Sequence, residues 1–484
     1  MRFHVVGLGS VGSLFAFHLR RTLSEDHPIS IIIRNRKRFL QPPNASTPLF
    51  VEKSSEVSNV RGFEWDEIDA LESRISNLVF DESGGVRNMF ARVDDGFEHR
   101  RFNRYREEQM QKNRNSTTSL SSTSRSSTLS GGRLRDNSTK IESLFVATKA
   151  FQVIPVLQQL RPRMSSSTTI VLLQNGMGIY EKVINELFRN PDERPHFVLA
   201  SNTHGAWLRK PLHTVHAGDG DLRFGIVPDP QGRDFEASTR SAEAGVRTRA
   251  LSLDDIAPPA FPARPSALPT STLQSNASSP PSLTSPDARY ASLRATIRLL
   301  LSLSELNPVW ETAENMQTRL RQKLVVNSVI NPLTALMGCR NGDLFLWPSA
   351  HRIAKAVCNE ASDVFKAQTL RHSNVNLSDS TTRHRYANIE LDEVNILLPR
   401  ELRSRELHLR CRKVSKQTAD NFSSMLVDMR KGGQTEIDFM NGYLHRAGLE
   451  YGVRTPTIDA LLWMVKLKKS MPNVAIDYYP HLKN

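Results

Sequence analysis

Short apolar runs alternate with amphipathic stretches over the first two hundred residues of the chain. Apolar or β-branched runs predict strands, and segments with apolar residues at a spacing of about 3.6 predict helices. Strands that alternate with helices are typical of a parallel sheet built from βαβ units. Strands are expected at 2–6, 29–33, 143–147, 170–173 and 198–202, and helices at 13–23, 153–160 and 180–188.

The pattern changes at about residue 313, after a helix expected over 290–303 and a last short strand ending at Trp310. Apolar residues then recur at helical spacing throughout. The chain therefore predicts an α/β domain over 1–312, with a parallel sheet, followed by an all-helical domain over 313–484. Helices of the second domain are expected within 320–337, 353–365, 418–429 and 458–466.

Two segments of the first domain, about 98–140 and 228–288, interrupt this pattern. The first contains a tract rich in Ser and Thr, and the second repeats Ser, Ala and Pro. Such segments bury too little apolar surface to offset the entropy lost on ordering. Both are predicted to be disordered inserts, which explains why only 39% of the residues are hydrophobic where ~45–50% is usual.

The chain is basic, with 64 Lys and Arg against 50 Asp and Glu and a formal net charge of +14. The segment 98–140 alone holds ten basic against four acidic residues. A basic segment of this kind could bind RNA or an anionic surface. A solvated loop is favoured, because the segment as a whole does not show the interleaved aromatic and basic residues of an RNA-binding module.

The location of the protein is expected to be cytoplasmic, with a mitochondrial location left open. No run reaches the ~18 uninterrupted apolar residues of a transmembrane helix. The chain opens on a strand-like run rather than on a secretory signal. Cys339, Cys358 and Cys411 are too few and too widely spaced for a disulfide framework, so buried thiols are expected. No metal is expected either, because His213 and His216 have no second pair of ligands near them in sequence.

A glycine-rich turn, Gly7-Leu8-Gly9-Ser10-Val11-Gly12, stands between the first strand and the first helix. Gly7 permits a tight turn, Gly9 lets the backbone approach a pyrophosphate, and Gly12 lets the helix pack close to the strand. The helix start supplies free N–H groups for the anion. The turn predicts a dinucleotide site in a Rossmann-like domain.

Arg34 ends the second strand, where an NAD enzyme usually places Asp or Glu for the ribose hydroxyls. An arginine there can bind a 2′-phosphate with two hydrogen bonds, which favours NADP over NAD. Lys37 and Arg38, a few residues on, are better explained as solvated loop charges.

Asn175 lies in Gln174-Asn175-Gly176-Met177-Gly178, directly after another strand. It would lie at the carboxyl edge of the sheet, where ligands of open α/β folds bind. A simple Asn-Gly turn explains the same residues equally well.

Lys323, Asn327 and Asn331 stand four residues apart on one face of an otherwise apolar predicted helix. Once buried, these side chains need polar partners, which a substrate with carboxylate, carbonyl and hydroxyl groups could supply. A solvent-facing stripe is the simpler alternative on spacing alone. Further along, Thr435 could cap a helix with Asp438, whereas the functional alternative places Ser424 and Glu436 in a cleft facing Lys323.

Taken together, these motifs resemble the ketopantoate reductase family (2-dehydropantoate 2-reductase). The run Lys-Leu-x-x-Asn-x-x-x-Asn-Pro-Leu-Thr-Ala from Lys323 is the most specific part. The resemblance covers nearly all the chain outside the two inserts and 373–414. The other matching pieces, in order, are the turn at Gly7, Thr148-Lys149-Ala150-Phe151, 174–178, Thr203-His204-Gly205-Ala206, Ser423-Ser424-Met425-Leu426 and Thr435-Glu436-Ile437-Asp438.

The resemblance implies roles for particular residues. Lys323 matches the catalytic lysine that donates the proton. Substrate-holding positions are matched by Asn327, Asn331, Asn341 and Ser424. Cofactor-contacting positions are matched by Gly7, Leu8, Gly9, Ser10, Val11, Gly12, Arg34, Lys149, Asn175, Ala206 and Glu436.

The function implied is NADPH-dependent reduction of 2-dehydropantoate to pantoate in pantothenate biosynthesis. Two alternatives stay open: a paralogous reductase of another branched 2-oxo acid, and a non-catalytic dinucleotide-binding scaffold that recruits RNA or a partner through basic inserts. Retention of Lys323 and Glu436 argues against the scaffold. The partner expected is a small-molecule 2-oxo acid, with a homodimer left open and neither membrane nor nucleic acid favoured.

Overall fold

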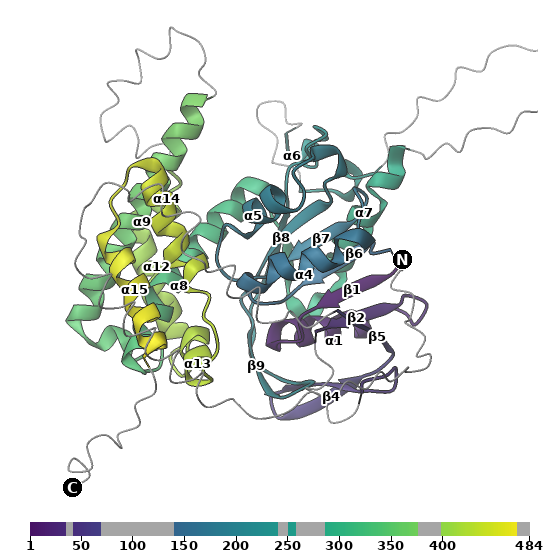
Figure 1. Ribbon diagram of the computed structural model, residues 1–484, viewed down its shortest axis with the longest axis horizontal. Helices are drawn as coiled ribbons and strands as arrows, with labels where there is room; N and C mark the ends of the chain where they lie inside the picture. The colour runs from purple at the N-terminus through teal and green to yellow at the C-terminus, as the bar shows by residue number, and fades with distance from the viewer. Residues whose placement is uncertain (35–41, 69–139, 241–249, 258–285, 376–397, 472–484) are drawn as a thin grey trace, which may run out of the picture. The chain divides into compact units, whose positions relative to one another are not determined.

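A computed structural model of the chain describes residues 1–34, 42–68, 140–240, 250–257, 286–375 and 398–471 (Figure 1). The described residues all belong to one compact unit formed by 1–68 and 140–484. The segment predicted to be disordered at 98–140 lies outside them, apart from its last residue. No helix within the described ranges is long and apolar enough to cross a membrane.

The α/β part is built on an eight-stranded sheet in the order β12-β11-β8-β7-β6-β1-β2-β5. β1 lies between β2 and β6, so the chain order reverses there, and ligands of such sheets bind outside the carboxyl ends of the strands at this point. The sheet is not wholly parallel as predicted, because β11 runs antiparallel to β8. The strands are β1 (Phe3–Val6), β2 (Ile29–Ile33), β5 (Phe63–Glu67), β6 (Ser143–Val146), β7 (Thr169–Leu172), β8 (His196–Asn202), β11 (Leu222–Ile226) and β12 (Pro308–Trp310).

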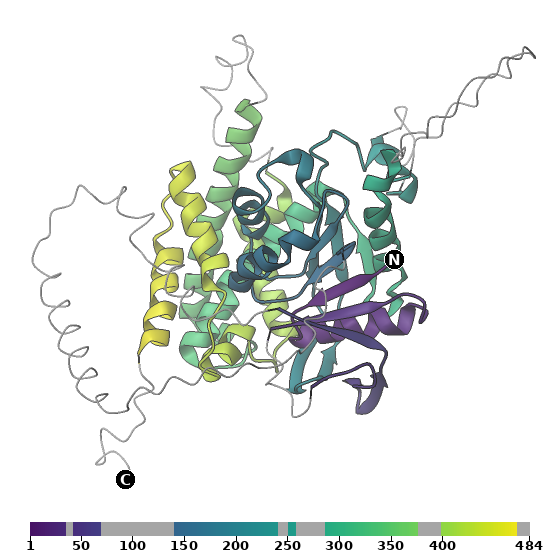
Figure 2. The same ribbon diagram turned by 45° about the vertical axis from the view of Figure 1, so that its right-hand side comes forward.

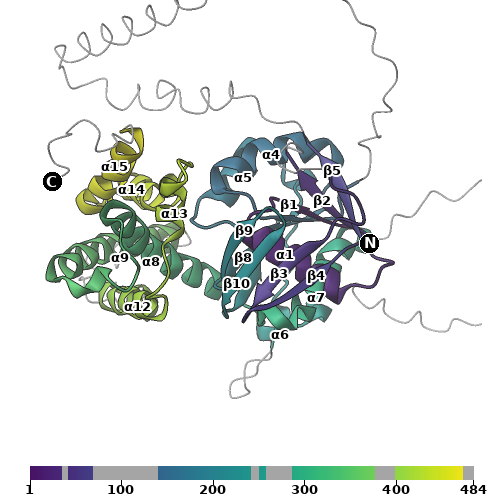
Figure 3. The same ribbon diagram turned by 90° about the horizontal axis from the view of Figure 1, so that it is seen from below.

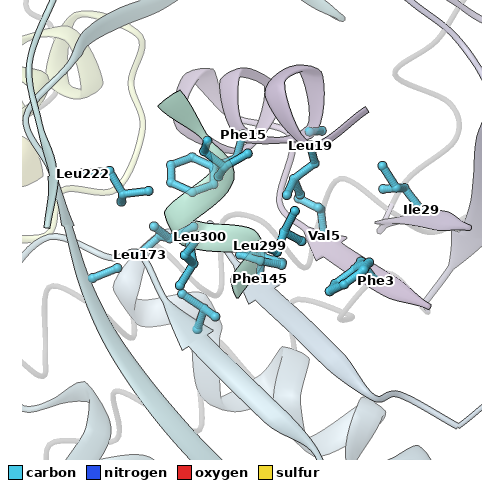
Figure 4. Close-up of a cluster of buried hydrophobic side chains, with 14 of the residues drawn as sticks. Phe3, Val5, Phe15, Leu19, Ile29, Phe145, Leu173, Leu222, Leu299 and Leu300 are labelled. Carbon is cyan, nitrogen blue, oxygen red and sulfur yellow. The ribbon is translucent and has the colours of Figure 1, made fainter. Parts of the chain in front are cut away.

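Helices cover both faces of this sheet. α1 (Ser10–Thr22) and α7 (Ala291–Ser302) bury one cluster, in which Phe15 and Leu300 meet Phe145 and Phe3 of the strands (Figure 4). α4 (Val153–Leu160) and α5 (Ile179–Glu186) bury a second cluster. The central strands are buried on both faces, which is why they appear in the sequence as unbroken apolar runs.

A second, four-stranded sheet, in the order β4-β3-β10-β9, packs against α1 and was not predicted. Three of its strands are partly exposed and lack the apolar runs that mark the main sheet, and the fourth, β3, has an apolar run of only three residues. The four strands are β3 (Leu49–Lys53), β4 (Glu56–Val60), β9 (Gly205–Lys210) and β10 (His213–Gly218).

The C-terminal part is helical and centres on α8 (Ala313–Met337), as Figure 3 shows. The Thr312 side chain accepts the Asn315 N–H at its start, and Gly338 ends it with φ +71°, a value that glycine adopts without strain. α8 continues through Pro332. In Figure 2 the two yellow helices α14 and α15 lie side by side. The helices around α8 are α9 (Pro348–Val375), α12 (Ser404–Gln417), α13 (Ser424–Arg430), α14 (Asn441–Tyr451) and α15 (Pro456–Ser470).

The helix predicted over 418–429 is wrong in its first half. The chain is helical in α12, leaves the helix at Thr418, and resumes only at Ser424. The intervening backbone bonds to another loop: Ala419 O and Asn421 O accept the N–H groups of Gly342 and Asn341. These tertiary hydrogen bonds replace the helical ones that the local pattern favours.

The insert predicted at 228–288 is also too wide. Phe235 and Ile256 are buried in the α/β core, and Ser238 donates to the Asp255 carboxylate. The Glu236 carboxylate accepts the Ala313 N–H at 2.6 Å. Isolated apolar residues and turn hydrogen bonds therefore order 228–240 and 250–257. The remainder of this insert, 241–249 and 258–285, lies outside the described residues.

Candidate active site

The glycine-rich turn has the geometry of an anion cradle. Gly7 has φ +97°, and a Cβ there would lie 2.7 Å from the Thr148 nitrogen. A Cβ on Gly12 would lie 1.9 Å from the Gly7 oxygen, so neither position accepts a side chain. Gly9 faces open space and starts α1 without a side-chain cap, and no acidic residue stands in the first turn.

The N–H groups at the start of α1 are therefore available to a phosphate. Beside the turn, the Thr148 hydroxyl is buried without a hydrogen-bond partner among the described residues. An orphaned donor next to an uncapped helix start fits the diphosphate of a dinucleotide.

Lys149 follows β6, the neighbour of β1, and binds two carboxylates of the helical part. Its Nζ lies 2.7 Å from Asp428 Oδ2 and 3.5 Å from Glu436 Oε2. Burial alone would lower the pKa of the Lys149 ammonium, but the charges of Glu436 and Asp428 outweigh it and raise that pKa. Lys149 is therefore a fixed positive charge at the carboxyl edge of the sheet.

Glu436 is buried, with 3% of its surface exposed, and its carboxylate is held from three sides. Oε1 accepts the Ala150 N–H at 2.9 Å, the Asn175 side chain forms a further hydrogen bond, and Lys149 supplies the charge. Burial raises the pKa of the Glu436 carboxyl despite these partners. The structure thus brings together Lys149, Asn175 and Glu436, three of the predicted cofactor-contacting residues.

The loop 174–178 is more than a turn. Met177 N–H donates to Phe439 O at 2.9 Å, and a Cβ on Gly176 would lie 2.3 Å from that oxygen. Gly176 has φ +88°, so the close approach and the backbone conformation both require glycine. The segment that carries Glu436 is thereby fixed against the end of β7.

Lys323 is half-buried on α8, and its Nζ donates to the Asn202 carbonyl oxygen at the end of β8, 2.9 Å away. Burial lowers the pKa of the Lys323 ammonium to about 8, although the Glu436 charge opposes this. A lysine with this pKa both holds and releases a proton near neutral pH. The Lys323 ammonium is thus a cation that can give up its proton near neutral pH.

The predicted substrate-holding residues are placed differently from one another. Asn331 is buried and donates to the Met440 sulfur, and the Asn341 amide donates to Thr418 Oγ1 while its own oxygen is buried without a partner. Within the described ranges the half-buried Asn327 amide has no hydrogen-bond partner. Ser424 is exposed at the start of α13; its neighbour Ser423 is buried, caps that helix and accepts from Thr334 Oγ1.

Two further predicted residues lie apart from the lysines' contacts. Arg34 donates to the Gln152 side chain at 2.6 Å, and Gln152 follows shortly after Lys149 in the chain. Lys37 and Arg38 lie outside the described residues. Ala206 lies in β9 and packs on the core beneath α1. Thr435 caps no helix, because the short turn 437–439 starts at Glu436 without a side-chain cap.

Sequence reasoning missed Asp428 and the Asn202 carbonyl. Asp428 lies on α13, between the motifs that contain Ser424 and Glu436. A carboxylate so close in sequence to both motifs is the signal that could have identified it. A backbone carbonyl leaves no signal in the sequence, so the partner of Lys323 could come only from the fold.

Comparison with known proteins matches two family models. Ketopantoate reductase PanE/ApbA matches residues 91–229, and Ketopantoate reductase PanE/ApbA C terminal matches residues 315–469, more than half of the chain together. The chain belongs to the ketopantoate reductase family. It is accordingly an oxidoreductase. The Gly-rich turn lies outside both matched ranges, so its place rests on the geometry above.

Curated relatives share the name of this family. A probable 2-dehydropantoate 2-reductase of Schizosaccharomyces pombe is 24% identical over 331 residues, 68% of this chain and 75% of its own length. The 2-dehydropantoate 2-reductase of Yersinia pestis is 25% identical over 330 residues, with the same shares.

Solved structures share the fold. D-mandelate dehydrogenase with NADH and anilino(oxo)acetate has a TM-score of 0.55 at 16% identity, over 97% of this chain and 98% of that one. The probable 2-dehydropantoate 2-reductase panE of Bacillus subtilis has a TM-score of 0.51 at 19% identity, over 97% and 100%. The prediction of a parallel-sheet domain followed by a helical region is therefore confirmed, with the antiparallel pairing of β11 and β8 as the exception within the sheet.

Proposed function

We propose that this chain reduces 2-dehydropantoate to pantoate with NADPH, in pantothenate biosynthesis. The observation that supports it most is that two lysines of the site have different partners. Lys149 binds carboxylates and stays charged, whereas Lys323 donates to a neutral carbonyl and can release its proton. The names of the curated relatives supply the substrate. When bound, NADPH supplies a hydride to the keto carbon of the substrate.

Lys323 is the proton donor in this proposal. Hydride addition builds negative charge on the keto oxygen, and the Lys323 ammonium neutralises and then protonates it. Its pKa of about 8 leaves most of it charged at neutral pH while the proton is still transferable. The Asn202 carbonyl orients the ammonium through its hydrogen bond.

Four polar side chains would hold the substrate. Asn327 and Asn331 follow Lys323 along one face of α8, and the Asn341 amide oxygen is buried without a partner. Ser424 is exposed on α13 and would join them. Orientation of the carboxylate and hydroxyl by these groups would turn the carbonyl toward the nicotinamide.

For the cofactor, Gly7 to Gly12 would hold the diphosphate, and Lys149, Asn175, Ala206 and Glu436 would line the rest of the dinucleotide site. NADP is proposed over NAD because Arg34 ends β2, on the side of β1 where the ribose of the adenosine is bound in folds of this kind. Gln152 holds the guanidinium in place there.

The domain division proposed remains 1–312 and 313–484. Two hydrophobic clusters of buried residues fill the α/β part, and a third fills the helical part. Met177 of the α/β part also belongs to this third cluster. Thr312, the cap of α8, marks the boundary.

A panel of 2-oxo acids, with NADPH or NADH oxidation as readout, tests the proposal. We expect 2-dehydropantoate with NADPH to give the highest kcat/KM. A higher value for another branched 2-oxo acid would replace the substrate, and absence of turnover with every acid would leave a dinucleotide-binding scaffold.

A further inference from the structure

The corner between β8 and β9, which presents Asn202 to Lys323, holds two buried histidines in direct contact. His204 Nδ1 lies 3.0 Å from His216 Nε2, and His204 Nε2 lies 3.0 Å from the Leu306 carbonyl oxygen. A carbonyl oxygen can only accept, so His204 Nε2 carries the proton and Nδ1 is bare in the neutral ring.

A second contact fixes the same tautomer. The Gly220 N–H donates to His204 Nδ1 at 3.1 Å. His216 must therefore donate to Nδ1 from its own Nε2. Burial lowers the pKa of His216, and the charges of His204 and Lys53 act in the same direction, so at pH 7 the His216 ring is a neutral donor.

The corner is tied to the lysine through one residue. The backbone N–H of His204 donates to the Asn202 side-chain oxygen Oδ1 at 3.2 Å, and the Asn202 backbone carbonyl accepts from Lys323 Nζ at 2.9 Å. A Cβ on Gly220 would lie 2.5 Å from the His204 nitrogen, so the loop crosses the corner at a distance that only glycine permits. His204 thus joins β10, this loop and the turn before β12 to the residue that holds Lys323.

We propose that His204 is a positioning residue: with His216 as its donor, it fixes the Asn202 carbonyl against the Lys323 ammonium and so aligns the proton donor of the reaction. The proposal rests on the proposed function, which assigns that proton to Lys323. The two histidines exchange no proton with the substrate; they set the place of an acceptor.

A metal ion is the rival explanation of this cluster. His204, His216 and Asp219 offer ligand atoms within 4.8 Å of one another. His204 Nδ1 already accepts the Gly220 N–H, however, and Asp219 pairs with the Lys53 ammonium at 2.8 Å. Both contacts would have to break for a cation to bind, which favours the hydrogen-bonded network.

Other charged groups face the cluster and bear on its pH dependence. His18 on α1 is buried, and burial, with the charge of His216 next in size, lowers its pKa to about 4. Lys53 on β3 and Asp219 on the loop after β10 pair with each other. Glu436 is the charge that acts on Lys323 itself. All of these groups are present in the variants below, and His18 titrates well below the basic limb of kcat near pH 8.

Two substitutions of His204 separate its two contacts. In His204→Gln the amide nitrogen can still reach the Leu306 carbonyl while the acceptor for Gly220 and His216 is lost. In His204→Asn the amide oxygen can replace Nδ1 while the donor to Leu306 is lost. We expect both to lower kcat by up to about 100-fold, the cost of an ångström-scale misplacement, with the KM for NADPH unchanged.

The pH dependence of kcat distinguishes a positioning role of His204 from a purely structural one. A carbonyl that accepts from the ammonium stabilises its charged form, so loss of the Asn202 contact lowers the pKa of Lys323. The basic limb of kcat should therefore move to lower pH in both His204 variants. His216→Gln, which keeps a donor at the Nε2 position, should retain most of the activity and the wild-type limb. His213→Gln on the same strand, where His213 instead contacts Glu52, is the matched control and should change neither.

A lower Tm in the His204 variants with an unmoved basic limb would reduce the network to a structural role. If those variants do not fold, His216→Asn, which removes the Nε2 donor, must show the same limb shift. Loss of wild-type activity on incubation with EDTA, restored by Zn²⁺, would favour the metal.

The proposed function is tested separately by Lys323→Ala. Normal turnover in that variant would reject the function proposed for the lysine. Severe loss there, with an unmoved limb in the His204 variants, would reject only the positioning role.

Discussion

The two lysines of the site have opposite surroundings. Lys149 lies between two carboxylates, Asp428 and Glu436, and its pKa is raised because their charges outweigh its burial. Lys323 meets a neutral carbonyl, and burial lowers its pKa to about 8 with only the Glu436 charge opposing. The same side chain is thus a permanent charge in one place and a proton donor in the other, and the number of carboxylates in contact makes the difference.

The largest effect is expected from Lys323→Ala. Loss of a general acid should lower kcat by on the order of 10² to 10⁴-fold, with NADPH binding nearly unchanged. Steady-state kinetics and a fluorescence titration of NADPH measure the two. Lys149→Ala is the matched comparison, because it removes the permanent charge and should raise the KM for the cofactor more than it lowers kcat. Equal losses of kcat in the two variants would mean that proton donation and cofactor binding are not separate roles of the two lysines.

Glu436 acts on both lysines, so Glu436→Gln sharpens the comparison through pH. In the wild type kcat should fall as the pH rises through about 8, because the general acid must be protonated. The Glu436 charge raises the pKa of Lys323, so its removal should move this fall to lower pH. The KM for NADPH should rise as well, since Lys149 loses one of its two charged partners. A basic limb that stays in place would show that Lys323 does not set it.

Arg34→Ala tests whether a third cation, at the end of β2, reads the 2′-phosphate. A hydrogen bond to a charged group contributes ~1.5–3 kcal/mol, and ~1.4 kcal/mol is tenfold in affinity. NADPH should therefore bind about one order of magnitude more weakly while NADH changes little. Titration of both nucleotides into both proteins by fluorescence gives the answer. Equal losses for the two would assign Arg34 to the fold, through its contact with Gln152, or to the adenine.

How much of this could be predicted differs between the two lysines as well. Most strands of the main sheet and the stripe on α8 follow from local pattern, and the β2 and α4 boundaries agree with it residue for residue. Strands β5 and β11 of the same sheet were not predicted. Lys149 and Asp428 are 279 residues apart in sequence, and no local pattern places them in contact. Strands β4, β9 and β10 are half exposed and largely polar, and β3 offers only the short run Leu49-Phe50-Val51, so the sheet that packs under α1 left too weak a signal.

The sequence also could not show which of two adjacent side chains is buried. Ser424 was predicted to hold the substrate and is exposed at the start of α13, whereas its neighbour Ser423 is buried as the cap of that helix. Which of them caps depends on where the helix starts, and tertiary bonds from the loop at Asn341 decide that.

The smallest effect is expected from shortening the second insert. Deletion of 258–284 removes a Ser-, Ala- and Pro-rich stretch that cannot bury a core, so kcat, KM and Tm should stay near the wild-type values. Extending the deletion back to residue 236 removes Ile256 from the core, and with it the Glu236 carboxylate that accepts the Ala313 N–H at the start of α8. Loss of a buried Ile side chain costs about 2–5 kcal/mol. The longer deletion should therefore lower Tm clearly in a thermal melt, and kcat with it, since α8 carries Lys323. Equal Tm values for the two deletions would show that 236–257 adds nothing to the domain, and a large loss from the shorter one would show that 258–284 packs on it.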